Sequence, residues 1–223
     1  MKTVIFVPFR GDGTHRTKAF KHVASHLSDL PYPMVVGDSG DEPFCFGRTF
    51  NYLTGLVEWD VAVLHDADAV VDLRRIEAAV EMAAKTDTVT YPWNRLVGLT
   101  RRGTALWYQN VELAARHYRR HRPPGRVPLG GPRVVSRRLW ETVRGFDPAF
   151  VGWGGEDDVF ARTAEVLCGP STRLGGQLVE LWHPKRENAP NDPYYQAREQ
   201  NRLLALKVRR MSAAEIREYV TSR

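Results

Sequence analysis

An acidic run follows a glycine-rich turn in the second half of the chain, in the sequence GWGGEDD (152–158). The glycines allow the backbone to turn tightly. Trp153 offers a flat face to a sugar ring, and a carboxylate beside it can take a proton from a hydroxyl group. Acids also favour helix N-termini by about 0.3–1 kcal/mol each, which explains one or two of the three acids but not the adjacent Trp. The run is therefore a candidate site for chemistry on a sugar hydroxyl group.

A second acidic motif, Asp66-Ala67-Asp68, ends the apolar segment VAVLH (61–65). Two carboxylates at this spacing can bind a hard divalent cation and contact a ribose or a diphosphate. A strand-to-helix turn with capping acids is the other interpretation, because Asp72 and Leu73 follow. The motif alone leaves both interpretations open.

Three further polar residues lie where apolar segments end: Arg10 after VPF, Asp38 in GDSG and His183 in LWHP. Each is a weak signal alone, and a lone histidine is more often structural than a ligand. In open parallel sheets, however, ligands bind beyond the carboxyl ends of the strands. Their position at strand ends, shared with Asp66 and Asp68, is the functional signal.

Segments with strand and helix patterns alternate along the chain, which predicts an α/β fold with a mainly parallel sheet flanked by helices. We expect strands at 3–9, 33–40, 61–68, 88–93 and 178–184, and helices at 15–28, 47–57, 73–84 and 104–121. A strand, a short helix and a turn are expected over 132–146. A glycine turn and helix over 152–167, a loop over 184–193 and a C-terminal helix complete the pattern.

The composition excludes several classes of protein. Apolar residues make up 43% and charged residues 26% of the 223 residues, close to globular averages, so a disordered or fibrous chain is excluded. The apolar stretches are far shorter than the roughly 20 residues that span a bilayer. The N-terminus lacks a signal-peptide pattern, and two cysteines are too few for a disulfide scaffold. We expect a cytoplasmic protein of one domain (1–223).

Basic residues are concentrated between Arg95 and Arg144. This segment has twelve Arg, no Lys and two acids, giving +10, whereas the rest of the chain carries −4. A local basic block suggests one surface that faces an anionic molecule. A solvated Arg-rich face is the alternative, since the whole chain favours Arg over Lys.

Together these segments resemble, in the same order, the β-1,4-galactosyltransferases of the GT-A glycosyltransferases. VPFR (7–10) is similar to the family's strand-end PFR, FGRTFNYL (46–53) to its F-x-R-x-x-x-N helix, and Asp66-Ala67-Asp68 to its D-x-D motif. The segment 129–160, which contains LGGPRVVS and GFDPAFVGWGGEDDVF, is the most specific match. HPKRENAPN (183–191) looks like the family's metal-binding His followed by a mobile loop.

The resemblance implies a nucleotide-sugar part (1–93), an acceptor and catalytic part (94–205) and a C-terminal helix (194–223). A UDP-sugar donor would be bound by residues at the strand ends and in two loops: Pro8, Arg10, Asp38, Arg48, Asn51, Asp66, Ala67, Asp68 and Trp153. Asp68 and His183 would hold Mn²⁺, which bridges the diphosphate.

The acidic run would bind the acceptor. The resemblance implies that Trp153 lies on a small mobile loop, that Gly155, Glu156 and Asp158 bind the acceptor, and that Asp157 is the general base. Deprotonation of the acceptor by Asp157 while UDP departs gives one in-line displacement with inversion.

Three positions depart from the family pattern. Glu180 stands where a methionine is often a metal ligand, and a carboxylate is a harder ligand, which makes Mg²⁺ an alternative to Mn²⁺. Pro128 replaces an aromatic that lines the donor pocket, so selectivity for galactose over glucose or N-acetylhexosamine is open. Val159 replaces the third Asp of GGEDDD. The chain also shows no membrane anchor or stem, which suggests a soluble bacterial or viral form.

Two other functions remain as alternatives. A sugar-phosphate nucleotidyltransferase is suggested by FRGDGTHR (9–16), which resembles a glycine-rich phosphate loop. A non-catalytic sugar- or nucleic-acid-binding protein on the same fold is the second. The acceptor is a saccharide or an anionic molecule, and the basic 95–144 segment makes DNA one candidate.

Overall fold

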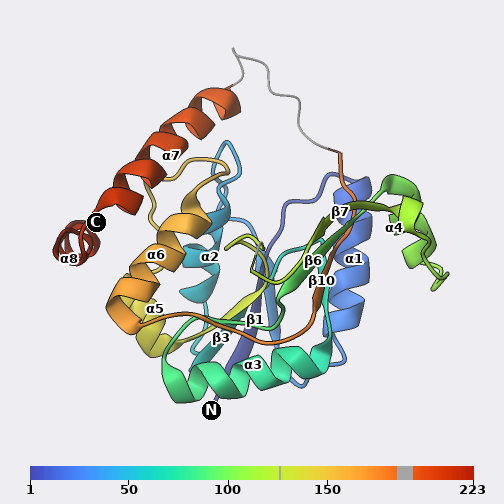
Figure 1. Cartoon of the computed structure of the whole chain (residues 1–223), viewed down its shortest axis with the longest axis horizontal. Helices are drawn as coiled ribbons and strands as arrows, with labels where there is room; N and C mark the ends of the chain where they lie inside the picture. The colour runs from blue at the N-terminus through green and yellow to red at the C-terminus, as the bar shows by residue number, and fades with distance from the viewer. Residues whose placement is uncertain (126, 185–192) are drawn as a thin grey trace.

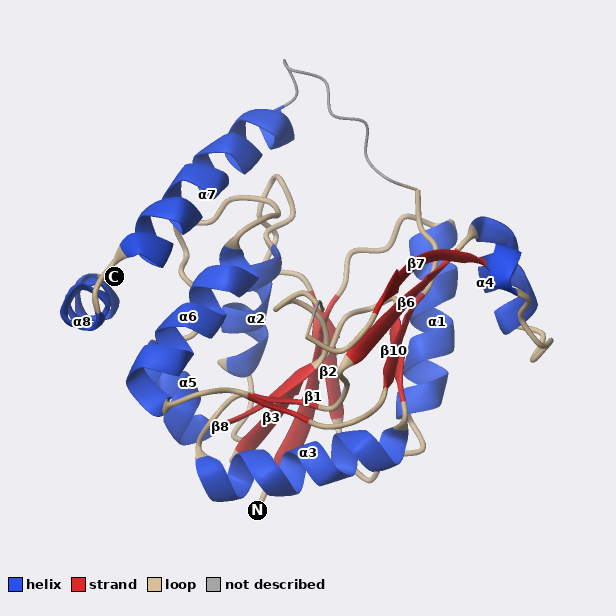
Figure 2. Cartoon of the chain, in the orientation of Figure 1, coloured by secondary structure: helices blue, strands red, loops and turns tan. Residues whose placement is uncertain are grey.

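The computed structural model describes residues 1–125, 127–184 and 193–223, and in these it contains helices packed around two β-sheets (Figure 1, Figure 2). The helices are α1 (His15–Leu27), α2 (Phe46–Thr54), α3 (Leu73–Thr86), α4 (Arg101–Trp107), α5 (Arg137–Val143), α6 (Glu156–Cys168), α7 (Pro193–Arg210) and α8 (Ala213–Ser222), with a 3₁₀ turn η1 (Ala115–His117). The strands are β1 (Thr3–Pro8), β2 (Met34–Gly37), β3 (Val61–Leu64), β4 (Ala69–Val71), β5 (Thr90–Tyr91), β6 (Arg95–Leu99), β7 (Tyr118–Arg122), β8 (Arg133–Ser136), β9 (Thr172–Arg173) and β10 (Gln177–Glu180).

The larger sheet has the strand order β2-β1-β3-β8-β5-β9. β1 runs parallel to β2 and β3, with Ile5 opposite Met34 and Val63, whereas β8 runs antiparallel to β3 and β5. All six residues of β1 are buried, as expected for a strand covered on both faces. The expected α/β fold with a mainly parallel sheet flanked by helices is confirmed. The carboxyl ends of β1, β2 and β3 share one edge, where Arg10, Asp38 and Asp66 follow.

The smaller sheet, in the order β4-β10-β6-β7, brings the end of the chain's last strand to the second acidic motif. β10 pairs antiparallel with β4 and parallel with β6. Beyond the strand, the Leu181 N–H donates to the Asp68 carbonyl at 2.8 Å. This pairing places His183 beside Asp68, although the two residues are far apart in the sequence.

The expected helix over 104–121 is wrong beyond Trp107. α4 ends there, Asn110 adopts a left-handed backbone conformation (φ 55°), and 118–122 forms the edge strand β7, paired antiparallel with β6. Gly103 also packs so closely on the His117 carbonyl that a Cβ would overlap it. Strand formation here depends on the partner β6, a tertiary contact that local periodicity does not report.

The single C-terminal helix expected over 194–223 is two helices. Ser212 begins α8 with a capping box: its hydroxyl accepts from the Glu215 N–H, and the Glu215 carboxylate accepts from the Ser212 N–H. A small separate core of Phe150, Val159, Val208 and Ile216 packs α7 and α8 against α6. This core fixes the residues on both sides of the glycine turn at 152–155.

Two other sequence expectations can be compared with the described residues. Both cysteines are free, Cys45 buried and Cys168 partly buried. Among the described helices, none combines the length and apolarity needed to cross a bilayer.

Candidate functional site

Arg10 and Asp38 form an ion pair beyond the ends of β1 and β2. Arg10 Nε donates to Asp38 Oδ2, and its Nη2 donates to Asp38 Oδ1 at 3.1 Å and to the Asp41 carbonyl at 2.9 Å. The hydrogen bonds from Arg10 hold the pKa of Asp38 below its ordinary value. The pair keeps the loop after β2 folded over the strand end, next to Pro8.

Arg48 and Asn51, on α2, are joined to the loop before the acidic run. Asn51 makes two hydrogen bonds with the backbone of Phe146, at 2.8 Å and 2.9 Å, which occupy both ends of its amide group. Arg48 donates to the Pro148 carbonyl at 2.7 Å and pairs with Asp41 at 3.1 Å. Arg48 therefore connects the loop after β2 to the approach to 152–158, and Asn51 joins α2 to the same approach.

Carboxylates from separate elements meet at the end of β3. Burial, together with the charges of Asp68 and Asp157, raises the pKa of Asp66 to about 8, against the opposing charge of Arg133. Burial and the charge of Glu180 also raise the pKa of Asp68, opposed by His183. A group of mutually repelling carboxylates is costly without a bound cation or ligand, and such groups are concentrated at functional sites.

The Asp68–His183 pair has the geometry of two neighbouring ligands to a small divalent cation. His183 Nδ1 donates to the Pro184 carbonyl at 3.0 Å, so that Nε2 faces Asp68 Oδ2, 3.3 Å away. Bonds of about 2.0–2.2 Å from one cation to both atoms are compatible with that spacing. Among the described residues, no group of three or more His, Cys, Asp or Glu is arranged to hold a metal.

Glu180 lies close enough to influence Asp66 and Asp68, and it also pairs with the basic strand β7. Its Oε2 accepts from Arg119 Nη2 at 3.0 Å. The ion pair neutralises part of the negative charge on this side of the site.

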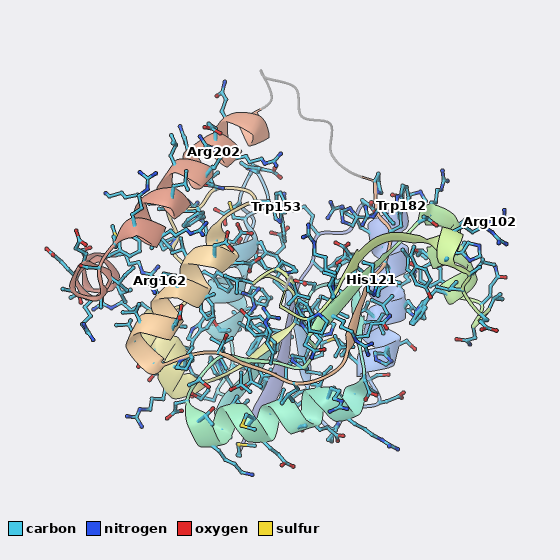
Figure 3. The ribbon with its side chains drawn as sticks, viewed as in Figure 1. Arg102, His121, Trp153, Arg162, Trp182 and Arg202 are labelled. Atoms are coloured by element: carbon cyan, nitrogen blue, oxygen red, sulfur yellow. The ribbon has the colours of Figure 1, made fainter. Side chains whose placement is uncertain are left out.

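The loop 152–155 presents Trp153 to solvent. Gly152, Gly154 and Gly155 have φ values of 74°, 115° and 90°, a left-handed region that favours glycine. Trp153 is 64% exposed, and the Arg198 guanidinium of α7 lies 5.7 Å from its ring centre. Figure 3 shows Trp153 beside α6 and α7, and Trp182 across the molecule near α1.

Glu156 and Asp158, which flank Asp157 at the start of α6, differ in exposure. Glu156 is 3% exposed, its Oε2 accepts from the Gly154 N–H at 2.6 Å, and Oε1 is buried without a partner among the described residues. Burial, together with the charge of Asp157, raises the pKa of Glu156 to about 8. Asp158 is exposed on the surface of α6, and its pKa is raised by partial burial and by Asp157.

Asp157 forms an ion pair with Arg133, a residue to which the sequence gave no role. Arg133 is 1% exposed and donates through Nη2 to Asp157 Oδ1. Burial alone would lower the pKa of Arg133, but the charge of Asp157 outweighs it and holds the pKa above its ordinary value. The sequence signal that could have pointed to Arg133 was a charged residue in the otherwise apolar strand RVVS.

The double glycine before β8 is packed against Asp157. A Cβ on Gly130 would overlap Asp157 Oδ2, and a Cβ on Gly131 would come within 2.7 Å of the Trp93 ring. Four side chains, three from strands and Trp93 from the segment after β5, donate to backbone carbonyls of the same loop: Arg173 to Pro128 at 2.8 Å, Tyr91 to Leu129 at 2.9 Å, Arg133 to Gly131 at 3.2 Å, and Trp93 to Pro132 at 2.8 Å. The sequence contained no local signal for this set of contacts.

The basic residues of 95–144 do not all lie on one surface. Arg133 is buried, and Arg137 lies over the Trp59 ring at 4.2 Å. Figure 1 shows α5 and α4 on opposite sides of the molecule. Folding therefore separates the residues of α5 from those of α4 and β7.

The glycine-rich loop before α1 is occupied by its own aspartate. Asp12 accepts from the backbone N–H groups of Thr14 and Thr17, at 2.8 Å and 3.2 Å. These are the groups that a phosphate would use at a helix N-terminus. The arrangement does not favour the nucleotidyltransferase alternative.

Residues 110–183, which include the double glycine, the acidic run and His183, match a family model described as the N-terminal domain of galactosyltransferase. The chain is galactosyltransferase-like. It is 27% identical over 187 residues to β-1,4-galactosyltransferase 5 of Danio rerio, a match that covers 79% of the chain and 42% of that protein. The chain thus spans less than half the length of this curated relative.

Solved structures establish the fold of the galactosyltransferase-like chain as GT-A. The catalytic domain of Drosophila β-1,4-galactosyltransferase 7, in complex with xylobiose, aligns with a TM-score of 0.54 at 17% identity, covering 90% of the chain and 79% of that domain. S. aureus TarS 1–349 with UDP-GlcNAc also gives 0.54 at 13% identity, covering 97% of the chain and 69% of TarS. The expected GT-A fold is confirmed.

Proposed function

We propose that this protein is an inverting glycosyltransferase that moves a hexose from a UDP-sugar to an acceptor hydroxyl group. One observation carries the proposal: Asp157 at the start of α6 converges with Asp66 and Asp68 at the carboxyl edge of the sheet, where burial and the charges of Asp68 and Asp157 together raise the pKa of Asp66 to about 8. The relatives are galactosyltransferases, and TarS was solved with UDP-GlcNAc.

The donor binds along the ends of β1, β2 and β3. Pro8, Arg10 and Asp38 flank the uridine in this proposal, and Asp66 and Ala67 face the ribose. Arg10 and Asp38 are already paired, so their geometry needs little rearrangement when the nucleotide binds, which favours affinity. Arg48 and Asn51 support this pocket through the loop that precedes Trp153.

Asp68 and His183 would hold a divalent cation, Mn²⁺ or Mg²⁺, which would supply positive charge against the departing diphosphate. Their 3.3 Å separation and the repulsion among nearby carboxylates support this assignment. Glu180 is the third candidate ligand, because its charge acts on Asp68 and it stands at the position of a family ligand; Arg119 now offsets part of that charge.

Asp157 is the general base. It takes the proton of the acceptor hydroxyl group, whose oxygen forms a bond to the anomeric carbon while the bond from that carbon to the phosphate oxygen breaks and UDP leaves with the electron pair. Trp153 covers the sugar, and Gly155, Glu156 and Asp158 bind the acceptor. The position of Asp157 at the start of α6, with its side chain 22% exposed, supports access by an acceptor.

The acceptor that we propose is a saccharide. Trp153 is a large exposed aromatic next to the carboxylates, a combination suited to a sugar ring. The separation of the basic residues onto two sides weakens the case for DNA, which remains an outcome of the test.

The experiment is a screen of UDP release with UDP-galactose, UDP-glucose, UDP-N-acetylglucosamine and UDP-N-acetylgalactosamine. Each donor is assayed with saccharides and with single-stranded DNA as acceptors, in Mn²⁺, Mg²⁺ or EDTA. We expect release with one donor, dependent on acceptor and metal. Binding of every donor without release or transfer would instead support a non-catalytic binding protein.

The variant Asp157→Asn tests whether Asp157 is the general base. Loss of a general base costs about 10²–10⁴ in rate, so we expect kcat to fall by that factor while the UDP-sugar Kd stays within twofold. The matched control is Asp87→Asn, an aspartate at the C-terminus of α3 that pairs with Arg138 at 3.3 Å. Unchanged turnover in Asp157→Asn would remove the residue from this role.

A further inference from the structure

We propose that Arg133 is the positioning residue for Asp157, fixing the carboxylate through Oδ1 and leaving Oδ2 as the atom that receives the acceptor's proton. The inference rests on the proposed function and assigns a role to a side chain that does not itself meet the substrate. It follows from how Arg133 is held, which oxygen it occupies and what surrounds the other oxygen.

The guanidinium of Arg133 has little freedom to move. It lies 5.5 Å from the Phe146 ring centre and 5.8 Å from that of Phe160, and the two rings stack on each other with centres 4.6 Å apart. Its Nε donates to the Gly131 carbonyl at 3.2 Å. Cation–π contacts and a backbone hydrogen bond thus orient Arg133 independently of Asp157.

The ion pair distinguishes the two oxygens of Asp157. Oδ1 accepts from Arg133 Nη2, and among the described residues no hydrogen bond to Oδ2 is formed. Oδ2 instead lies against Gly130, where the absence of a side chain leaves it room. The paired oxygen is a poor proton acceptor, so the proton of the acceptor hydroxyl group goes to Oδ2.

Arg133 also offsets the negative charge around the carboxylate. Asp157 faces Asp66 at the end of β3, Glu156 and Asp158 on α6, and the Tyr91 hydroxyl of β5. The three carboxylates repel Asp157, whereas the Arg133 guanidinium attracts it through Oδ1. Without Arg133, we expect the carboxylate to leave the position in which Oδ2 lies against Gly130.

The primary test compares Arg133→Lys and Arg133→Met with the control Arg137→Met. Arg137 is also stacked on an aromatic ring and donates to a backbone carbonyl, that of Trp59 at 3.1 Å, but it does not contact Asp157. A misplaced catalytic group can cost about 10²-fold in rate. We expect kcat to fall about 100-fold in Arg133→Met and about 10-fold in Arg133→Lys, with the UDP-sugar Kd within twofold of wild type and the control unchanged.

A double-mutant comparison separates positioning from a general structural effect. If Arg133 acts through Asp157, adding Arg133→Lys to Asp157→Asn lowers the residual rate by less than twofold. A full additional 10-fold loss, or a rise in Kd parallel to the loss of kcat, would overturn the proposal.

Gly130→Ala provides a second measurement that keeps both residues of the ion pair, because removing one partner of a buried pair can unfold a protein. Gly130 does not need a left-handed backbone, and the added methyl group overlaps Oδ2. We expect kcat to fall at least 10-fold with donor Kd unchanged, whereas an unchanged kcat would overturn the proposal.

The outcomes also distinguish this inference from the proposed function. Absence of transfer in the wild type overturns both the proposed function and this inference. Full activity of Asp157→Asn rejects the role of Asp157 as general base. Inactive Asp157→Asn beside fully active Arg133 and Gly130 variants rejects only the positioning role.

Discussion

The burial of Glu156 makes the stability of the protein depend on pH in a direction that can be measured. Glu156 is 3% exposed, and burial together with the charge of Asp157 raises its pKa from an ordinary value of 4.5 to about 8. Because the folded state binds this proton more tightly than the unfolded state does, the contribution of Glu156 to stability is fully present below pH 4.5 and is lost as the pH rises towards 8. At about 1.4 kcal/mol per pH unit, the loss between pH 5 and pH 8 is about 4 kcal/mol.

Glu156→Gln removes the titration and keeps an oxygen that can accept from the Gly154 N–H. We expect the free energy of unfolding of the variant, relative to wild type, to rise by about 4 kcal/mol from pH 5 to pH 8. The assay is urea unfolding at intervals across this range, without metal or donor. Taking the difference between variants cancels the other titrating groups.

Glu165→Gln is the matched control, because Glu165 lies on the same helix but is exposed and pairs only with Arg162 at 3.7 Å among the described residues. We expect its relative stability to stay within about 0.5 kcal/mol across the range. A Glu156→Gln difference that is flat with pH, or that moves in the opposite direction, would refute the reasoning.

Three further predictions concern the metal and the basic surface. Asp68→Ala and His183→Ala each remove one ligand of the proposed cation. The Mn²⁺ concentration for half-maximal donor binding, measured by calorimetry, should therefore rise at least 10-fold. A Mn²⁺ midpoint that does not change in a variant excludes that residue as a ligand. Glu180→Met removes a hard carboxylate and releases Arg119, so activity in Mg²⁺ relative to Mn²⁺ should fall. An unchanged ratio of the two activities would contradict a role for Glu180 at the cation. The Arg119→Ala/Arg120→Ala/Arg122→Ala variant should lose any binding of single-stranded DNA seen at low salt, because such binding depends on counterion release; equal binding by wild type and variant would show that β7 is not the contact.

The sequence by itself determined which residue types stand at the ends of the strands. A buried strand requires a run of apolar residues, and the run stops where polar side chains begin, so Arg10, Asp38 and Asp66 could be assigned to strand ends from local pattern alone. The glycine turn before Glu156 was similarly readable, because three left-handed backbone positions require residues without a side chain.

Tertiary structure alone decided which of these residues meet. The ion pair of Arg133 and Asp157 joins β8 to α6, and the contact of His183 with Asp68 requires β10 to pair with β4. The strand β7, expected as helix, forms because β6 offers it a partner. Local sequence encodes propensity and periodicity, whereas strand pairing and buried ion pairs depend on groups brought together from distant parts of the chain, and that is where the site acquired its geometry.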